Sequence, residues 1–248
     1  MTQQTKHKII PAIDIKNGCC VRLLQGDYQK EKIYNQDPLA IAKKWDISGI
    51  DFIHIVDLDG AKQGFPVNLK IIEKIANSIN AKIEVGGGIR TEQDVEKLLK
   101  IGVSRVILGT SICETPEKTA DFVKKYGTEK IVAGIDAKNE KVAIHGWTKN
   151  TGINTYELIA KIADAGIKRI IYTDILTDGM LCGPNINAIK NLSKQFPYLK
   201  FISSGGISSL QDIKKLFKNT PDNLEAVIIG KALYENKFSI EEAIQISF

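Results

Sequence analysis

The chain has 248 residues, 43% hydrophobic and 25% charged, which fits a folded domain with a full core and excludes a disordered chain. The formal charge is +5, but basic residues do not cluster with aromatic ones, so no nucleic-acid surface is expected. No apolar run approaches about 20 residues and no secretory signal begins the chain, so we expect no membrane association and a cytoplasmic location.

Short runs of β-branched residues recur along the chain and are typical of strands. They cover residues 9–15, 52–58, 82–85, 105–108, 131–136, 169–173, 199–203 and 226–229. Segments with helical spacing lie between them, at 38–47, 69–79, 92–101, 116–126, 156–165, 186–196, 211–217 and 240–246. This alternation predicts the α/β class and a single (β/α)8 TIM barrel over residues 1–248.

Helix starts carry recognisable capping signals. Thr91 with Asp94, and Ser208 with Gln211, have the spacing of N-terminal capping pairs. The four cysteines have no CxxC pairing and no histidine placed to complete a zinc site. We therefore expect free thiols and no metal.

The second half of the chain repeats the first. The segments 12–14, 87–89 and 106–109 match 134–136, 205–207 and 227–230, each found 118 to 122 residues later. Anchors in one order at a nearly constant offset indicate internal duplication. The sequence therefore predicts two fused half-barrels, at about residues 1–128 and 129–248.

Each half contains two glycine turns that follow a strand and precede a helix. Such turns bring backbone amides close to an anion, and barrels often hold phosphate this way. The candidate phosphate-binding residues are Gly87, Gly88, Gly109, Thr110 and Ser111 in the first half, and Gly205, Gly206, Gly230 and Lys231 in the second. Two such sets predict a substrate with two phosphates, although the glycines could also serve only to make tight turns. Neither set is a dinucleotide or Walker fingerprint, so no nucleotide cofactor is indicated.

Asp14 and Asp136 close the first and fifth predicted strands, at the rim where barrel enzymes place their chemistry. Either one alone could simply cap the next helix. Together they can face each other across the barrel mouth and share general acid and general base work, each contributing about 10² to 10⁴ in rate. A catalytic triad is excluded because no nucleophile elbow or cysteine–histidine pair is present.

Other polar residues near strand ends leave two interpretations open. Asp57, Asp174 and Asp178 could orient substrate hydroxyls or could terminate strands. His54 lies within an apolar strand, which favours a barrel-interior histidine over a catalyst. Trp147 lies in a polar loop after the fifth strand, where a lid that stacks on a base is favoured over a buried anchor.

With these features assembled, the sequence resembles the histidine-biosynthesis isomerase family that acts on phosphoribosylformimino-aminoimidazole carboxamide ribotide. The resemblance covers residues 9–248 and rests on IIPAIDIKNG, VRLLQGDY, FIHIVDLDGAK, VGGGIR, VILGTS, GIDAKN, HGWTKNTG, YTDILTDGML, SSGGIS and VIIGKAL. It implies a duplicated half-barrel, a bisphosphorylated ribonucleotide substrate and an Amadori rearrangement of an aminoaldose to an aminoketose. It also implies an aldose–ketose isomerase without metal or organic cofactor.

The resemblance also implies roles for single residues. Asp14 would be the base at the sugar C2 proton and Asp136 the acid that opens the ribose, while Thr173 and Asp178 would orient the opening ring. The glycine turns with Thr110 and Lys231 would hold the phosphates. Arg22 and Trp147 would contact the substrate, the latter by stacking on the aminoimidazole.

Two alternatives stay open at this point. The cyclase subunit of imidazole glycerol phosphate synthase shares the aspartates and phosphate turns, but it tends to read CLDVKDG and lacks the RLLQGD and GW features found here. A barrel that binds phosphate without catalysis is the other. His145 stands where relatives that also isomerise phosphoribosylanthranilate often have arginine, which puts that second activity in doubt. No association element is evident, so a monomer is expected.

Overall fold

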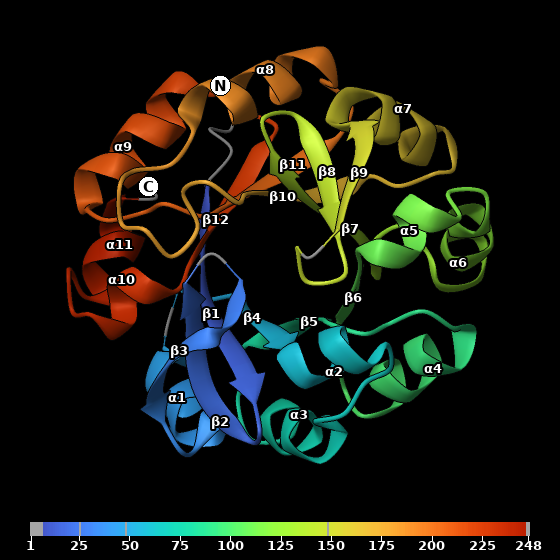
Figure 1. Cartoon of the computed structure of the whole chain (residues 1–248). Coiled ribbons are helices and arrows are strands. Elements are labelled where there is room, and N and C mark those ends of the chain that lie inside the picture. The colour runs from blue at the N-terminus through green and yellow to red at the C-terminus, as the bar shows by residue number, and fades with distance from the viewer. Residues whose placement is uncertain (1–6, 25, 48, 148, 247–248) are drawn as a thin grey trace.

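The computed structural model describes residues 7–246 apart from positions 25, 48 and 148. Within this part of the chain, eight parallel strands close into a barrel with helices around it (Figure 1). The strands in barrel order are β1 (Lys8–Lys16), β4 (Phe52–Asp57), β5 (Lys82–Gly86), β6 (Arg105–Leu108), β7 (Ile131–Lys138), β10 (Arg169–Asp174), β11 (Lys200–Ser204) and β12 (Leu224–Ile229), with β12 again beside β1. The predicted TIM barrel is confirmed.

The strands are rich in β-branched residues because both of their faces are buried. Every residue of β6 and of β10 is buried. One set of apolar side chains fills the barrel interior and includes Ile10, Ile107 and Ile171, and a larger set lies between the barrel and the helices. The candidate site residues at the strand ends are therefore attached to strands that are packed on both faces.

The outer helices agree with those expected from the sequence, with small shifts at their ends. They are α1 (Pro38–Trp45), α3 (Leu69–Ala76), α4 (Glu92–Lys100), α6 (Lys118–Tyr126), α7 (Thr155–Asp164), α8 (Ile186–Gln195), α9 (Leu210–Asn219) and α11 (Ile240–Ile246). Short additional helices follow three strands: α2 (Leu58–Gln63), α5 (Thr110–Glu114) and α10 (Lys231–Tyr234). Across residues 7–246, outside the three gaps, no helix combines the length and apolar character needed to cross a bilayer.

The capping prediction is confirmed at one helix and wrong at another. Thr91 and Asp94 form a reciprocal capping box at the start of α4. The box at α9 is formed by Ser209 and Asp212, not by Ser208 and Gln211. Asp212 also accepts from the Ser208 hydroxyl at 2.7 Å. Asp212 therefore accepts hydrogen bonds from two neighbouring serines at the start of α9. The spacing rule placed the capping pair one residue too early.

Two hairpins that the sequence did not predict extend the barrel mouth. β2 (Cys19–Leu24) and β3 (Asp27–Asn35) follow β1, and β8 (Lys141–Ile144) and β9 (Lys149–Asn154) follow β7. In Figure 1 they lie on opposite sides of the mouth, in blue and yellow-green. β3 has a run of exposed residues and β9 reads KNTGIN, so neither has the apolar alternation that predicts a strand.

Equivalent features therefore recur in the two parts of the chain. A hairpin follows β1 and another follows β7, the strands that the repeat equates. Gly109 and Gly230 share nearly the same backbone angles, φ −110° with ψ −91° and φ −111° with ψ −90°. These correspondences support the division near residue 128, which stays a prediction.

Candidate active site

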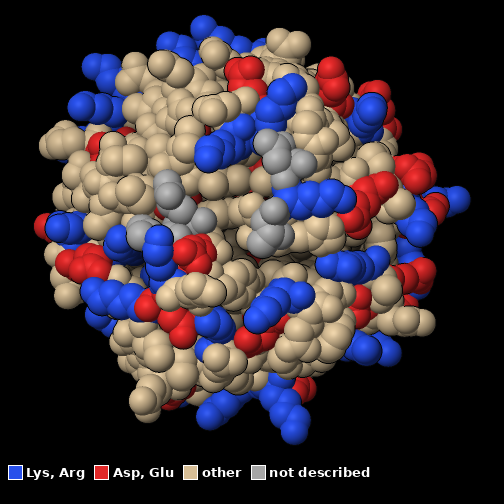
Figure 2. Space-filling view, viewed as in Figure 1, with Lys and Arg blue, Asp and Glu red and all other residues tan. Residues whose placement is uncertain are grey.

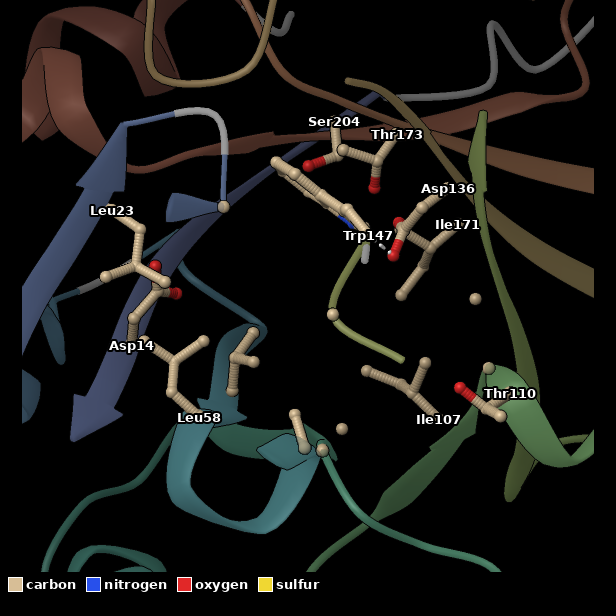
Figure 3. Close-up of a pocket in the computed structure, with 18 of the residues that line it drawn as sticks. Asp14, Leu23, Leu58, Ile107, Thr110, Asp136, Trp147, Ile171, Thr173 and Ser204 are labelled. Atoms are coloured by element: carbon tan, nitrogen blue, oxygen red, sulfur yellow. Dashed lines mark hydrogen bonds between the residues drawn. The ribbon is translucent and has the colours of Figure 1, made fainter. Parts of the chain in front are cut away.

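A pocket opens at the barrel mouth, where the C-terminal ends of the strands meet. Its wall brings together the predicted site residues Asp14, Arg22, Asp136, Trp147, Thr173 and Asp178. Figure 3 shows Asp14 and Asp136 on opposite sides of this pocket, with the Trp147 ring between them in that view. The face around the mouth carries acidic and basic side chains interspersed, without one continuous basic patch (Figure 2).

Asp14 lies one residue before the last pairing of β1 with β4 and is paired with an arginine from the first hairpin. The Arg22 guanidinium lies 2.9 Å from its carboxylate, and both side chains are largely shielded from solvent. Burial raises the pKa of Asp14, while the positive charge of Arg22 opposes this rise. The pair places a carboxylate of increased basicity against the pocket, which suits a general base.

Asp136 occupies the matching place on β7 and is held by the second hairpin. The Trp147 indole N–H donates to Asp136 Oδ2 at 2.8 Å. Burial raises the pKa of Asp136, and hydrogen bonds from Trp147 and Thr173 act in the opposite direction by favouring the carboxylate. A raised pKa suits a group that must carry a proton near neutral pH.

Trp147 is half-buried at the turn of the β8–β9 hairpin, and its ring packs on Gly26 in the other hairpin. His145, Gly146 and Trp147 all have left-handed backbone conformations, with φ of 56°, 62° and 70°. Such a conformation costs of order 1–3 kcal/mol for a non-glycine residue and is found where function requires it. The turn therefore aims the indole into the pocket, and stacking on a base stays a prediction.

The three remaining strand-end aspartates separate into two classes. Asp57 accepts from the Gly60 N–H and Asn68 Nδ2 at Oδ1, at 2.8 and 2.7 Å, and from the Val67 and Asn68 N–H groups at Oδ2, at 2.7 and 2.9 Å. This fully buried carboxylate ties the loop after β4 together. For Asp57, the strand-terminating interpretation holds.

Asp174 likewise accepts hydrogen bonds that hold the loop after β10 together. It accepts from the Leu176 N–H at 2.9 Å and from Asn185 Nδ2 at 2.7 Å. Asp178 differs because it lines the pocket beside Arg22. Burial raises the pKa of Asp178 to about 6, with Arg22 opposing the rise and Asp14 and Asp136 adding to it. Asp178 is therefore the member of the three that can meet a substrate.

The glycine turns lie at two cavities that share part of their walls. Gly87, Gly88, Gly109 and Thr110 line the main pocket. Gly205, Gly206, Gly230 and Lys231 line a smaller pocket, and Arg22 and Asp178 contribute to both. Two glycine-lined cavities joined through the site of the aspartates fit a ligand with an anionic group at each end.

Close packing also explains several of these glycines. A Cβ atom on Gly88 would collide with the Gly60 carbonyl, and one on Gly206 would collide with the Gly183 carbonyl. Both residues have positive φ, 77° and 87°. The turns therefore need glycine whether or not a ligand binds, and phosphate binding stays a prediction that rests on their position in the cavities.

Two predicted phosphate-site side chains have partners within the protein. The Ser111 hydroxyl donates to the Ile89 carbonyl at 3.3 Å, and Ser111 is not part of the pocket wall. The Lys231 ammonium lines the smaller pocket and donates to the Gly179 carbonyl at 2.7 Å. Lys231 can thus supply charge to an anion, whereas the Ser111 side chain contributes to the turn.

Gly230 leaves room for Arg22, and this yields a matched test. A Cβ atom on Gly230 would collide with the Arg22 guanidinium, whereas one on Gly109 would make an ordinary 3.6 Å contact with the Gly134 carbonyl. Gly230→Ala is expected to displace Arg22 from Asp14 and lower kcat/KM by roughly 10-fold or more, since a charge-assisted bond is lost. Gly109→Ala has the same backbone geometry and is the control. Steady-state kinetics that rank the two variants equally would contradict this role of Gly230.

Comparison with known proteins identifies the family. A family model described as histidine biosynthesis protein matches residues 8–239. The chain is 46% identical to a Bacillus subtilis (strain 168) protein over 237 residues, 96% of each chain. It is 45% identical to a Clostridioides difficile (strain 630) protein, covering 96% of this chain and 97% of the relative, and 42% identical to a Parabacteroides distasonis protein, covering 97% and 99%. The chain belongs to the histidine biosynthesis protein family.

These three family members carry the same name, 1-(5-phosphoribosyl)-5-((5-phosphoribosylamino)methylideneamino) imidazole-4-carboxamide isomerase. In this histidine biosynthesis family member the structure also adds pocket residues that the sequence did not single out: Tyr28, Arg90 and Ser204. Arg90 ends the VGGGIR motif, so its place beside a glycine turn was a usable signal. Tyr28 lies on the unpredicted β3 and could not have been placed.

Proposed function

We propose that this protein is the isomerase that converts the bisphosphorylated aminoaldose phosphoribosylformimino-aminoimidazole carboxamide ribotide to its aminoketose by an Amadori rearrangement. The observation that carries the proposal is the pair Asp14 and Asp136, which face one glycine-lined pocket that shares part of its wall with a second glycine-lined cavity. The names of relatives that match nearly the whole chain support the same reaction.

The chemistry divides between the two carboxyl groups. Protonated Asp136 gives its proton to the ribose ring oxygen as the bond between C1 and that oxygen breaks, which leaves an open-chain iminium. Ionised Asp14 then takes the C2 proton, and the electron pair of that C–H bond forms an enolamine. Loss of the proton on the C2 hydroxyl and gain of one at C1 complete the aminoketose. Thr173 and Asp178 orient the opening ribose, and Arg22 keeps Asp14 ionised.

Further aspects of the proposal concern what binds and where. The glycine-lined cavities hold the two phosphates, and Trp147 stacks on the aminoimidazole and covers the site. Proton transfer between these side chains and the substrate requires neither metal nor organic cofactor. We propose a monomer in the cytoplasm, in keeping with a small-molecule biosynthetic activity.

The decisive experiment supplies the purified protein with the aminoaldose in the absence of metal, glutamine and ammonia. Chromatography with mass detection should reveal a new species of unchanged mass. An untouched aminoaldose, together with splitting of the aminoketose into two smaller products when ammonia is added, would indicate the cyclase instead. Binding without conversion of either compound would indicate a barrel without catalysis.

The bond from Trp147 to Asp136 predicts a change in pH dependence. The indole N–H favours the carboxylate and so lowers the pKa of Asp136, and Trp147→Phe removes this donor while keeping an aromatic ring. The pKa of Asp136 should therefore rise. Because a general acid must be protonated, the alkaline limb of the kcat/KM profile, which reports the free protein, should move to higher pH.

Trp45→Phe is the control, since Trp45 is buried in the core beside Tyr234 and outside the pocket wall. It should leave the pH profile in place. If the alkaline limb of Trp147→Phe coincides with that of the unmodified protein, Asp136 is not the acid whose ionisation this indole controls.

A further inference from the structure

His54 lies on the pocket wall, on β4, and has no part in the chemistry proposed above. It lies within electrostatic reach of Asp14, Asp136 and Asp178, the carboxyl groups that face the substrate site. Its ring is about nine-tenths buried. An imidazole ring on the same pocket wall as all three acids is well placed to affect the reaction.

The partner of His54 is a carboxylate that solvent does not reach. His54 Nδ1 lies 3.0 Å from Glu84 Oε1, and Glu84 is fully buried. The other oxygen, Glu84 Oε2, accepts from Arg105 Nη1 at 3.2 Å. The three residues lie directly opposite one another on β4, β5 and β6, so they form one row across the barrel wall.

Arg105 anchors the far end of this row. Its guanidinium lies over the Phe52 ring, 3.8 Å from the ring centroid, and its second terminal nitrogen lies 3.5 Å from Glu225. Glu225 in turn accepts from Arg169 at 2.6 Å. A buried carboxylate is tolerated only when it is paired in this way, so Glu84 is held as an ion with little freedom to move.

The pairing fixes which ring nitrogen of His54 carries the proton. A carboxylate bound to arginine offers only lone pairs, so Nδ1 must donate to Glu84. In a neutral imidazole the other nitrogen, Nε2, is then an acceptor. Since Nδ1 is occupied by Glu84, Nε2 is the polar ring atom that His54 can present to the pocket.

We propose that Glu84 is a positioning residue that holds His54 in the Nδ1–H form, so that Nε2 accepts a hydrogen bond from a ribose hydroxyl of the substrate. The identity of that hydroxyl donor rests on the function proposed above; the proton arrangement of His54 does not. A sugar hydroxyl is the donor that a neutral imidazole acceptor recognises, and the reaction must orient hydroxyls as the ring opens.

Glu84→Gln reverses this arrangement with almost no change in shape. Arg105 can only donate, so the new amide must turn its oxygen to Arg105 and its NH₂ to His54. Nδ1 then has to accept, and the ring proton moves to Nε2. The substrate hydroxyl would meet a donor in place of an acceptor.

Nitrogen NMR of protein labelled with ¹⁵N-histidine tests the proton arrangement without substrate. The chain has three histidines, and His54→Gln assigns the signal of interest. At about pH 8.5, unmodified His54 should have the Nδ1–H signature and Glu84→Gln the Nε2–H signature. Glu225→Gln removes another carboxylate partner of Arg105 without touching His54, and should keep the Nδ1–H signature.

Kinetics test the consequence for the reaction. Glu84→Gln should lower kcat about 10-fold, the effect of one misdirected hydrogen bond, while Glu225→Gln keeps kcat. An Nε2–H signature in the unmodified protein, or a reversed signature in Glu84→Gln with unchanged kcat, would overturn the proposal. If the unmodified protein has the Nδ1–H signature but no isomerase activity, the proposed function fails while the role of Glu84 in orienting His54 stands.

Discussion

Asp14→Asn and Asp136→Asn should each lower kcat by at least about 10², with substrate binding largely retained. Each change keeps the size of the side chain and removes the group that exchanges a proton. The two residues face the same pocket from β1 and β7, so neither can replace the other in position (Figure 3). Steady-state kinetics with the bisphosphorylated aminoaldose measure the effect, and KM separates lost chemistry from lost binding.

Neither variant should lose its activity through unfolding. Burial raises the pKa of Asp136 above its value in the unfolded chain. At pH values above both of these pKa values, the ionised form of Asp136 therefore opposes folding. Asp136→Asn removes this opposition, and its melting temperature at neutral pH should not fall. Burial raises the pKa of Asp14 in the same direction although Arg22 opposes the rise, so the melting temperature of Asp14→Asn should not fall either.

Asp59→Asn is the matched control for turnover. Asp59 lies at the same end of the barrel, on α2, but outside the pocket wall. It should keep near-normal kcat. Near-normal kcat in either Asp14→Asn or Asp136→Asn would instead refute the acid and base assignments.

Asp57→Asn should destabilise the fold by roughly 3–5 kcal/mol, equivalent to a fall of roughly 10 °C in melting temperature for a domain of this size. Both oxygens of Asp57 accept from two donors each, and the site is fully buried. An amide turned either way sets its NH₂ against two of those donors. Thermal unfolding followed by circular dichroism measures the change.

Asp59 again supplies the comparison. Its Oδ2 accepts from the Asn17 N–H at 2.7 Å and from Asn68 Nδ2 at 2.9 Å. In Asp59→Asn one amide oxygen can keep both bonds, so we expect a loss of about 1 kcal/mol or less. Equal melting temperatures for the two variants would show that Asp57 does not organise the loop after β4.

The barrel could be predicted because its signals are local. Strand and helix periodicity lies within each segment, and the buried strands are continuous apolar runs. The hairpins could not, because β3 and β9 gain their order from pairing with neighbouring strands and not from their own composition. Arg22 and Trp147 were therefore identified as candidates by motif, but without the hairpins that carry them.

The aspartates illustrate the same limit within the site. Asp174 and Asp178 are four residues apart and equally polar in sequence. What separates them is the donor Asn185, eleven residues beyond Asp174, which occupies Asp174 and leaves Asp178 to the pocket. Likewise, Glu84 and His54 are thirty residues apart and meet only because β4 and β5 are neighbours in the barrel.

The side chains that reach across the mouth bear on how such a protein can evolve. Arg22, from the first predicted half, occupies the space above Gly230 in the second, and Trp147, from the second, rests on Gly26 in the first. A mutation in either hairpin therefore alters the opposite wall of the pocket. Selection on one predicted half therefore acts on the other as well, and if the two halves arose by duplication, they would have had to diverge together once these contacts were in place.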